Sequence, residues 1–530
     1  MENNKNVIIA VLLMLAVWFY FNQNQKPADV PDNQTVATTV QPDVIAPAVV
    51  TTAVPSMTPS VVTSAPEIKV EIKTPLYTAD FNSIGGRLDS MQLLNYGATA
   101  ADNTVPVHVV EASTPRLATL GLQGKSGIDL NSETNYALLQ KPIKSELTGT
   151  DSTEIVFRST GTGIIIDRVY TLRADSYLIG VETRVMNTGT AALSGELEIS
   201  LLQPWDASIK NDMVVFTGVS SLVDGKLEQV SVDDLKEESP TYGAGTTWTS
   251  FETKYFISAI IPTSGAADKV RIVRDGDIIR NYVVTPFFTI APGTQQSYSY
   301  DAFFGPRDES ILEAVGHQMT EAISYGIFTP IAVPLLKTLR FFYGYLGNYG
   351  LAIILLTVII KLIFWPLTHK SYASMKSMQK LQPEMAKLKE KYKNDRQRQG
   401  QEMMEMYKKH RVNPMGGCLP MVIQIPVFFA LYRVLYQAIE LRHAPFMFWI
   451  TDLADKDPYY ITPIIMGATM FIQQKLTPST ADPMQQKIFL LMPVIFTALF
   501  LNFPAGLVIY WLVNNLLTIT QQVYIHRTMS

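Results

Sequence analysis

The sequence predicts a multi-domain membrane protein, in which an all-α bundle of transmembrane helices is joined to a large all-β sandwich outside the membrane. Three observations predict this fold class. Of the 530 residues, 47% are hydrophobic and the mean hydropathy is +0.12, which is typical of a membrane protein with a sizeable soluble part. Long uncharged apolar runs are concentrated at the N-terminus and in the last third of the chain. The residues between them alternate with period two, as strands do.

Charge is divided unevenly along the chain. Residues 67–308 contain 20 Lys and Arg against 30 Asp and Glu, whereas residues 366–416 contain 12 against 5. Short cytoplasmic loops collect Lys and Arg, so we expect the two regions on opposite sides of a membrane, with the basic region in the cytosol. The sequence has one cysteine, Cys418, so an intrachain disulfide framework is excluded.

The N-terminal 66 residues are predicted to anchor and tether the chain. Residues 7–21 are an apolar run whose length lies between that of a signal-peptide core and that of a spanning helix. Because no small-residue cleavage site follows, we interpret residues 1–21 as an uncleaved transmembrane anchor, with a cleaved signal peptide as the alternative. Residues 22–66 carry seven prolines and many Val, Thr and Ala, which predicts a flexible tether.

Residues 67–308 are predicted to form the β-sandwich. Period-two alternation is clear in residues 68–73, 164–186 and 195–201, with turn signals between the runs. The segment Gly161-Thr162-Gly163 lacks the third glycine of a dinucleotide fingerprint, and we interpret it as a hairpin turn. The region has no metal-ligand spacing, nucleophile elbow or phosphate loop. We therefore expect a binding or spacing role, with no catalytic residue, metal or cofactor.

Residues 309–327 connect the sandwich to the membrane unit. Their apolar positions follow helical spacing against three glutamates. This pattern predicts an amphipathic helix along the outer membrane interface, or alternatively a helix packed on the sandwich.

Residues 328–530 are predicted to form a membrane core of five helices. The candidate spans are residues 349–365, 418–439, 459–474, 488–503 and 505–525. Together with the N-terminal anchor they make six spans. This number places the N-terminus and the basic loop in the cytosol and the acidic domain outside, in agreement with the positive-inside rule.

Polar side chains within the predicted spans gather at one depth, in the inner half. They are Thr357, Lys361, Gln424, Gln473, Gln474, Asn514, Thr518 and Gln521. The outer halves are almost wholly apolar, so the pattern predicts a cavity that is polar only in its cytoplasmic half rather than a through-pore. Arg433 is an exception, because it lies in the outer half of its span. Its charge is explained either by snorkelling of the side chain or by a carboxylate partner.

Each polar group also has a purely structural interpretation. Lys361 lies four residues from the end of its apolar run, about 6 Å along a helix, so its stem could snorkel to the inner headgroups. The polar stripe on the last span could simply join helices through hydrogen bonds.

Residues 371–411 are predicted to form an amphipathic antiparallel helical hairpin in the cytosol. Apolar residues recur at steps of three and four on both sides of a polar turn at residues 394–396. Its methionines would suit an adaptable docking surface, or the hairpin could pack on itself with a solvated lysine face. The positive charge suits anionic lipid or ribosomal RNA.

Several segments of the membrane unit resemble the YidC/Oxa/Alb family of membrane protein insertases. They are NPMGGCLPMVIQIPVFFALY (413–432), ELRHAPFMFWITDLADKDPYYITPIIMG (440–467), TADPMQQKIFLLMPVIF (480–496) and FPAGLVIYWLVNNLLTITQQ (503–522). The N-terminal half is similar to the Gram-negative YidC type more loosely, through residues 82–96 and 303–308. The resemblance covers residue 349 to the end with high specificity.

The resemblance implies insertion and folding of new inner-membrane proteins through a hydrophilic groove open to the cytosol and to lipid, alone or beside the Sec translocon. It implies no covalent catalysis. The implied partners are nascent membrane proteins, the Sec translocon, the ribosome, signal-recognition components and membrane lipids, but not DNA. The chain would be a multi-pass protein of the bacterial inner membrane with residues 22–327 in the periplasm.

The resemblance also assigns site residues. The family's groove carries an arginine, and Lys361 occupies the matching position, which keeps the charge but loses the bidentate guanidinium fork. By the same matching, Thr357 and Tyr510 line the groove, Trp365 and Tyr372 lie at its mouth, and Asp482 lies in a loop that faces the ribosome.

Other function classes fit the sequence less well. An ion-coupled transporter would also hold charge in a membrane, but the chain shows no internal repeat. An intramembrane protease needs a catalytic dyad, and the sequence offers no paired membrane aspartates, Ser-His pair or H-E-x-x-H motif. An accessory chaperone of the translocon stays an alternative, because it could use the same groove.

Overall fold

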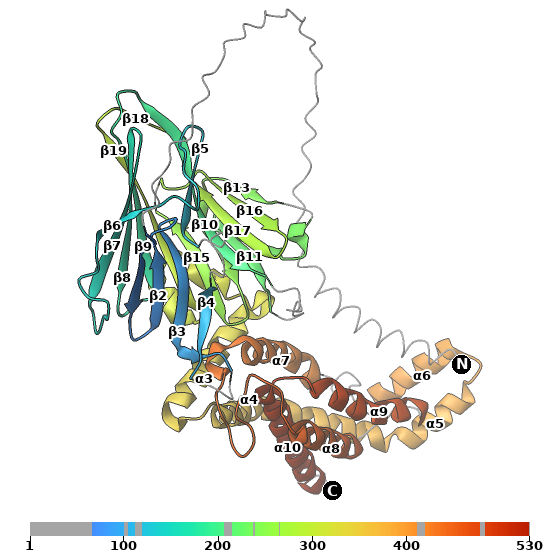
Figure 1. Ribbon diagram of the computed structural model, residues 1–530. Coiled ribbons are helices and arrows are strands. Elements are labelled where there is room, and N and C mark those ends of the chain that lie inside the picture. Colours follow the sequence, from blue (N-terminus) through green and yellow to red (C-terminus); the bar gives the residue numbers. More distant parts are fainter. Residues whose placement is uncertain are drawn as a thin grey trace, which may run out of the picture.

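The computed structural model describes residues 66–99, 104–111, 119–205, 215–236, 239–263, 265–410, 419–477 and 483–528. The predicted anchor, the tether up to residue 65 and Asp482 lie outside the described residues. A β domain stands above a unit of helices, with a short linker between them (Figure 1).

The β domain contains the strands expected from period-two alternation. They are β1 (Lys69–Lys73), β2 (Tyr77–Asn82), β3 (Arg87–Gly97), β4 (Pro106–Glu111), β5 (Gly121–Lys125), β6 (Ala137–Gln140), β7 (Ser152–Gly161), β8 (Ile164–Arg173), β9 (Leu178–Asn187), β10 (Leu193–Pro204), β11 (Gly218–Val223), β12 (Lys226–Ser231), β13 (Thr241–Tyr242), β14 (Thr246–Glu252), β15 (Phe256–Pro262), β16 (Lys269–Asp275), β17 (Ile278–Val284), β18 (Phe288–Ile290) and β19 (Gln295–Pro306), with the short helix η1 (Asp234–Lys236) after β12. A large all-β sandwich is therefore confirmed.

The strands pair antiparallel in three sheets. One sheet has nine strands in the order β12-β11-β14-β15-β19-β9-β8-β7-β6. A second has the order β13-β16-β17-β10-β18, with β5 paired to β10, and β1 to β4 form the third. Side chains of β9 alternate strictly between buried and half-buried, because successive residues of a strand point to opposite faces. The predicted hairpin turn is confirmed, since β7 ends at Gly161, β8 begins at Ile164 and Gly163 has φ +77°.

The linker differs from the single interfacial helix predicted for residues 309–327. It consists of α2 (Glu309–Val315) and the short helices η2 (Met319–Ala322) and η3 (Gly326–Phe328). The prediction was wrong because Gly316, His317 and Gln318 all have positive φ, which ends helical geometry there. Leu312, Met319 and Ala322 are fully buried in the core of the β domain. Packing on the sandwich, the alternative, is what the structure shows.

The helical unit follows the linker. Its elements are α3 (Thr329–Leu346), α4 (Tyr349–Lys380), α5 (Gln382–Lys391), α6 (Arg396–Lys409), α7 (Leu419–Gln437), η5 (Ile439–Leu441), α8 (Ile461–Leu476), α9 (Pro483–Phe500) and α10 (Ala505–Thr528). Within the described part of the chain, α4 alone is long and apolar enough to cross a membrane by length and composition. It runs past Pro366, because a proline removes only one main-chain hydrogen bond and neighbouring contacts can hold the helix.

The helices share an apolar core that is separate from the core of the β domain. Ile353 and Leu356 of α4 pack with Leu435 of α7 and Leu507 of α10. Helices α5 and α6 form a third, small cluster in which Leu381, Met385, Met406 and Tyr407 are buried. The hairpin arms therefore pack against each other, which was the structural alternative to a docking surface.

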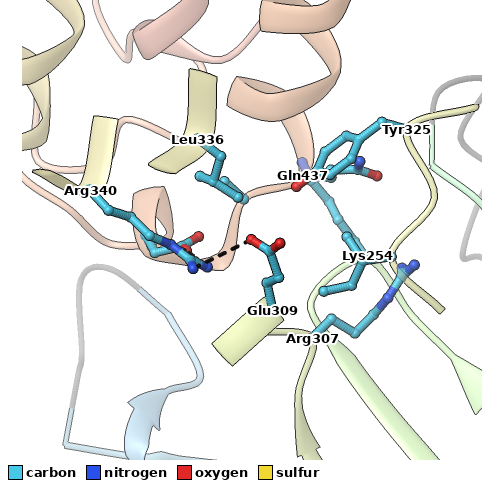
Figure 2. Close-up of a pocket in the computed structure, with 10 residues that line it drawn as sticks. Lys254, Arg307, Glu309, Tyr325, Leu336, Arg340 and Gln437 are labelled. Carbon is cyan, nitrogen blue, oxygen red and sulfur yellow. Dashed lines mark hydrogen bonds and ion pairs between the residues drawn. The ribbon is translucent and has the colours of Figure 1, made fainter. Parts of the chain in front are cut away.

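A charged junction joins the two units (Figure 2). Arg340 of α3 donates from Nε to Oε1 of Glu440 in η5 over 2.5 Å. Its guanidinium also lies 3.4 Å from Asp308 and 3.7 Å from Glu309, at the start of α2. A second arginine, Arg307, lies 3.1 Å from the buried carboxylate of Glu252 in β14. Burial raises the pKa of Glu252, and the positive charge of Arg307 opposes that shift.

Two further cations fix the C-terminal end of α7 and the residues after it to the β domain. Lys254 Nζ lies 4.1 Å from the ring centroid of Tyr436 in α7, a cation–π distance. Arg442, just after η5, donates to the carbonyl oxygen of Gly97 over 2.7 Å. The position of the β domain is thus tied to α7 and η5 by directional polar contacts.

Candidate functional site: a buried polar cluster around Lys361

The side chain of Lys361 lies inside the helical unit and is met by polar groups of α10. The residue is 7% exposed. Its Nζ donates to Thr518 Oγ1 over 2.6 Å and to Asn514 Oδ1 over 3.3 Å. Asn514 and Thr518 are four residues apart in α10, so they present their side chains on one face. The predicted match in depth between Lys361 and this stripe therefore becomes direct contact.

A third helix completes the cluster. Gln424 of α7 donates from Nε2 to Asn514 Oδ1 over 3.2 Å. Thr518 donates its own hydroxyl proton to the carbonyl oxygen of Asn514 over 2.6 Å, which leaves its oxygen lone pairs facing the ammonium. Helices α4, α7 and α10 thus meet at one charged group.

Two further predicted residues lie close to this cluster. The hydroxyl of Thr357 donates to the carbonyl oxygen of Ile353, one turn earlier in the same helix, over 2.6 Å. It shares a face with Lys361 as expected, but its proton is used within α4. Tyr510 is 2% exposed, and its ring stacks on Phe428, 6.3 Å between centroids. Its side chain is also hydrogen-bonded to Gln424, so it lies between the apolar core and the polar cluster.

A second polar layer lies nearer the end of α10. Gln521 Nε2 donates to the carbonyl oxygen of Trp365 over 3.3 Å. Gln522 Nε2 donates to Tyr372 Oη over 2.7 Å and to Thr477 Oγ1 over 2.9 Å. Trp365, Tyr372 and Gln521 were predicted as site residues from the sequence, whereas Gln522 and Thr477 were not. The adjacent pair Gln521-Gln522 was the available signal.

Several acceptors in this layer are unused. The Oε1 atoms of Gln473, Gln521 and Gln522 are buried and have no hydrogen-bond partner within the described part of the chain. Buried amide oxygens are nearly always paired, with water if not with protein. The layer can therefore accept hydrogen bonds from water or from a bound polar group.

Among the described residues, the cluster carries one positive charge without a matching negative one. The partners of the Lys361 ammonium, Thr518 and Asn514, are both neutral. Such a buried cation is costly in a membrane and attracts an anion of suitable geometry. The described residues contain no group of three His, Cys, Asp or Glu that could hold a metal ion. In the outer half of α7, the structure gives Arg433 no carboxylate partner among the described residues.

Comparisons with known proteins place the whole chain in one family. Residues 341–530 match the family model "60Kd inner membrane protein", and residues 69–338 match the model "YidC periplasmic domain". A membrane protein insertase YidC from Geobacter sp. (strain M21) is 48% identical over 466 residues, which cover 87% of this chain and 86% of that protein. The YidC of Geobacter metallireducens is 42% identical over 534 residues, covering 99% of each chain.

A solved structure was also matched, under the description of an active YidC insertase crystal structure with the first transmembrane domain resolved. The match covers 85% of this chain and 91% of that chain at 17% identity, with a TM-score of 0.37. The two family models and the sequence relatives decide the assignment. The chain belongs to the YidC family of membrane protein insertases.

Proposed function

We propose that this insertase moves polar segments of new membrane proteins through a half-depth hydrophilic groove, in which Lys361 acts as a counter-charge. The single observation that carries the proposal is the contact of a buried ammonium with the neutral Thr518 and Asn514. A carboxylate of a passing segment replaces one of these neutral partners. At an effective dielectric constant near 20 and a separation of about 4 Å, the attraction is about 4 kcal/mol. That offsets much of the cost of a partly desolvated acid and still permits release.

The proposed groove combines the Lys361 cluster with the layer beneath it. Its lining would be Lys361, Thr357, Gln424, Tyr510, Asn514, Thr518 and Gln521, with Trp365 and Tyr372 at the mouth. The unused amide oxygens of the lower layer support a hydrated inner half. Lys361 is 7% exposed, so entry of a substrate requires α10 and α7 to part from α4.

The protein is a bacterial inner-membrane protein with a periplasmic domain. For its topology we propose six spans, an uncleaved anchor at residues 1–21, a cytoplasmic N-terminus and hairpin, and residues 22–327 in the periplasm. The charge difference between residues 67–308 and 366–416 supports this arrangement.

Nascent membrane proteins are the substrates, as the family implies. We further propose the Sec translocon, the ribosome, signal-recognition components and membrane lipids as partners. The exposed basic residues of α5 and α6 support ribosome contact, together with the loop that contains Asp482. Deletion of residues 382–409 spares α4 and is expected to weaken ribosome binding; binding of unchanged affinity would contradict this role for the hairpin.

The counter-charge is tested by insertion of a substrate with an acidic translocated tail, in cells depleted of the native insertase. Lys361→Ala is expected to lower insertion at least tenfold, because it removes the whole attraction of about 4 kcal/mol and each ~1.4 kcal/mol corresponds to a factor of ten. Lys361→Arg is expected to preserve insertion. Lys337→Ala serves as the control, because it removes an exposed lysine that is not part of the groove. If Lys361→Ala inserts the substrate as well as Lys361→Arg, the counter-charge role is wrong.

An accessory chaperone is the second candidate, because it could use the same cluster. Reconstitution of the full chain alone into liposomes separates the two. Insertion of a short substrate without Sec supports an autonomous insertase, and insertion only with Sec supports the accessory role.

A further inference from the structure

Within the described part of the chain, the edge of the nine-stranded sheet next to the linker has no further strand paired to it. Strand β12 is the last strand of that sheet and pairs on one side with β11. The two strands are joined by a two-residue turn, Asp224-Gly225, with φ values of +51° and +77°. Two consecutive residues with positive φ make a type I′ turn, whose flanking residues, Val223 and Lys226, form a hydrogen-bonded pair.

The turn fixes which backbone groups of β12 are unpaired. Hydrogen-bonded and non-hydrogen-bonded pairs alternate along an antiparallel ladder. Because Val223 and Lys226 are a bonded pair, Glu228 and Val230 also direct their N–H and C=O groups toward β11. Leu227 and Gln229 therefore direct theirs away from the sheet. The free edge offers a donor and an acceptor at every second residue.

A cavity of about 510 Å³ lies along this free edge. One wall is β12 with Leu227 and Gln229, and the facing wall is the linker with Thr320, Ser324 and Tyr325, continued by Val333 in α3. Cavities of this size hold ligands of a few hundred daltons, which includes a short stretch of extended polypeptide.

The cavity adjoins the helix that carries part of the polar cluster. Ser324, in the facing wall, accepts a hydrogen bond from Nε2 of Gln437, the last residue of α7, over 3.5 Å. Gln424 in the same helix contacts Asn514. A segment that leaves the helical unit beside the outer end of α7 thus meets the free edge of β12.

We propose that the free edge of β12 binds an extended polypeptide by strand addition, and that its occupant is the translocated segment of a membrane protein during insertion. The proposal rests on the proposed function, because it places an emerging substrate beside α7. Alternating N–H and C=O groups match another extended backbone and are not matched by a lipid headgroup. Backbone pairing also accepts segments of many sequences, as an insertase with varied substrates requires.

The charges around the cavity refine the expected occupant. Its lining carries one cation, Lys226, and three carboxylates, those of Glu228, Glu309 and Glu321. Lys226 pairs with Glu228, and Glu309 pairs with Lys337 and Arg340. Among the described residues, the carboxylate of Glu321 is left without a cation and disfavours an acidic segment at this position. We expect neutral or basic segments to bind here more strongly than acidic ones, the opposite preference to that of Lys361.

The test uses the full chain in proteoliposomes with a defined single-span substrate that has a neutral translocated tail. A photo-crosslinking amino acid at Thr320 reports whether the tail occupies the cavity. Gln229→Pro removes one outward N–H and leaves the pairing with β11, and proline is tolerated at such edge positions. We expect it to lower the crosslinking yield about threefold to tenfold, which corresponds to the loss of one backbone hydrogen bond.

Two further variants separate binding from folding. Val230→Pro removes an N–H that faces β11 and is expected to destabilise the strand. Its melting curve therefore shows how a misfolded variant behaves, for comparison with Gln229→Pro. Ser324→Trp fills the cavity from the linker without changing any residue of β12, and is expected to lower the yield as Gln229→Pro does. A crosslinker at Leu138 in β6, the opposite edge of the same sheet, is expected to give a low yield with every variant.

The possible results distinguish failure of strand addition from failure of the proposed insertase function. An unchanged yield with both Gln229→Pro and Ser324→Trp overturns the proposal, and so do crosslinks to lipid alone. Protease protection of the tail is measured in the same vesicles. If the tail is inserted but never crosslinks at Thr320, strand addition is wrong and the insertase function stands. If the wild-type protein inserts no substrate in these vesicles, insertion by this chain alone is contradicted instead.

Discussion

Lys361 shows how a single charge can be kept inside a helical unit without a counter-ion. Its ammonium is held by Thr518 and Asn514, and the orientation of the Thr518 hydroxyl is set by a bond to its own helix. Neutral partners lower the cost of burial less than a carboxylate would, and so leave the charge available to an incoming acid.

Asp301 of β19 provides a test of burial in the β domain. Burial raises the pKa of its carboxyl, and His317 opposes the shift. Above about pH 4, the ordinary carboxyl pKa, the folded state therefore holds more protons than the unfolded state. The contribution of the Asp301 carboxyl to stability is lost as the pH rises through the pKa of this group in the folded state. We expect Asp301→Asn to raise the melting temperature of the β domain at pH 8 and to change it little at pH 4.

The control for Asp301 is Gln296, an exposed residue of the same strand whose side chain does not ionise. The difference in melting temperature between Gln296→Asn and wild type is expected to be the same at pH 4 and at pH 8. An Asp301→Asn variant that is less stable than wild type at pH 8 would contradict the desolvation argument.

Close packing of α8 and α9 depends on one glycine. A Cβ added at Gly467 would lie 1.9 Å from Thr497 Oγ1. Overpacking of this kind costs about 1–3 kcal/mol, so Gly467→Ala is expected to lower the unfolding free energy of the helical unit by that amount. Thr497→Ala removes the clashing oxygen, and the double variant should regain part of the loss in a double-mutant cycle.

Gly344 of α3 is the matched control for Gly467. No atom lies within 4 Å of a Cβ added there. Gly344→Ala should therefore be neutral or stabilise the protein by up to about 1 kcal/mol through helix propensity. Equal destabilisation by both substitutions would show that contact with Thr497 is not the cause.

Arg340 connects three elements, α3, α2 and η5, through carboxylates that otherwise repel one another. Its side chain is 25% exposed and that of Glu440 is 11% exposed, so the pair is largely shielded from solvent. We expect Arg340→Met to cost about 2 kcal/mol, at the low end for truncating one member of a buried charge pair. The loss should be measured as faster hydrogen exchange in residues 308–328.

Lys337, one turn from Arg340, is the control. Its side chain is 64% exposed and its contact with Glu309 is 3.8 Å long. Surface pairs contribute about 0–1 kcal/mol, so Lys337→Met should leave exchange in the linker nearly unchanged. An equal effect of the two substitutions would indicate that charge balance, and not the geometry of Arg340, holds the junction.

On the scale of the whole molecule, two large apolar cores are joined by a polar junction. The core of the β domain includes Leu312 and Ala322 of the linker, whereas the second core begins with Tyr325 and Ala332. Units with separate cores unfold as separate cooperative transitions unless their interface is large and apolar.

We therefore expect calorimetry of the full chain to show two transitions, one for each core. Arg340→Met should move the two transitions apart, because it weakens the coupling between the units. A single transition in both wild type and Arg340→Met would contradict the description of the junction as a polar link between independent cores.

The sequence by itself determined the class of each region. Period-two alternation predicted the sandwich, uncharged runs predicted the helices, and i, i+4 spacing put Asn514 and Thr518 on one face. These features depend on local geometry, which neighbouring residues set. The resemblance to a family of insertases was likewise carried by continuous segments.

Only the tertiary structure decided which groups meet. Lys361 and Thr518 are 157 residues apart in the chain, and Gln522 and Tyr372 are 150 apart. The break in the linker depends on Leu312 and Met319 finding space in the sandwich core, and the open edge of β12 depends on where the linker passes. Periodicity fixes the face on which a side chain lies, but its partner is set by the packing of distant segments, which no local pattern records.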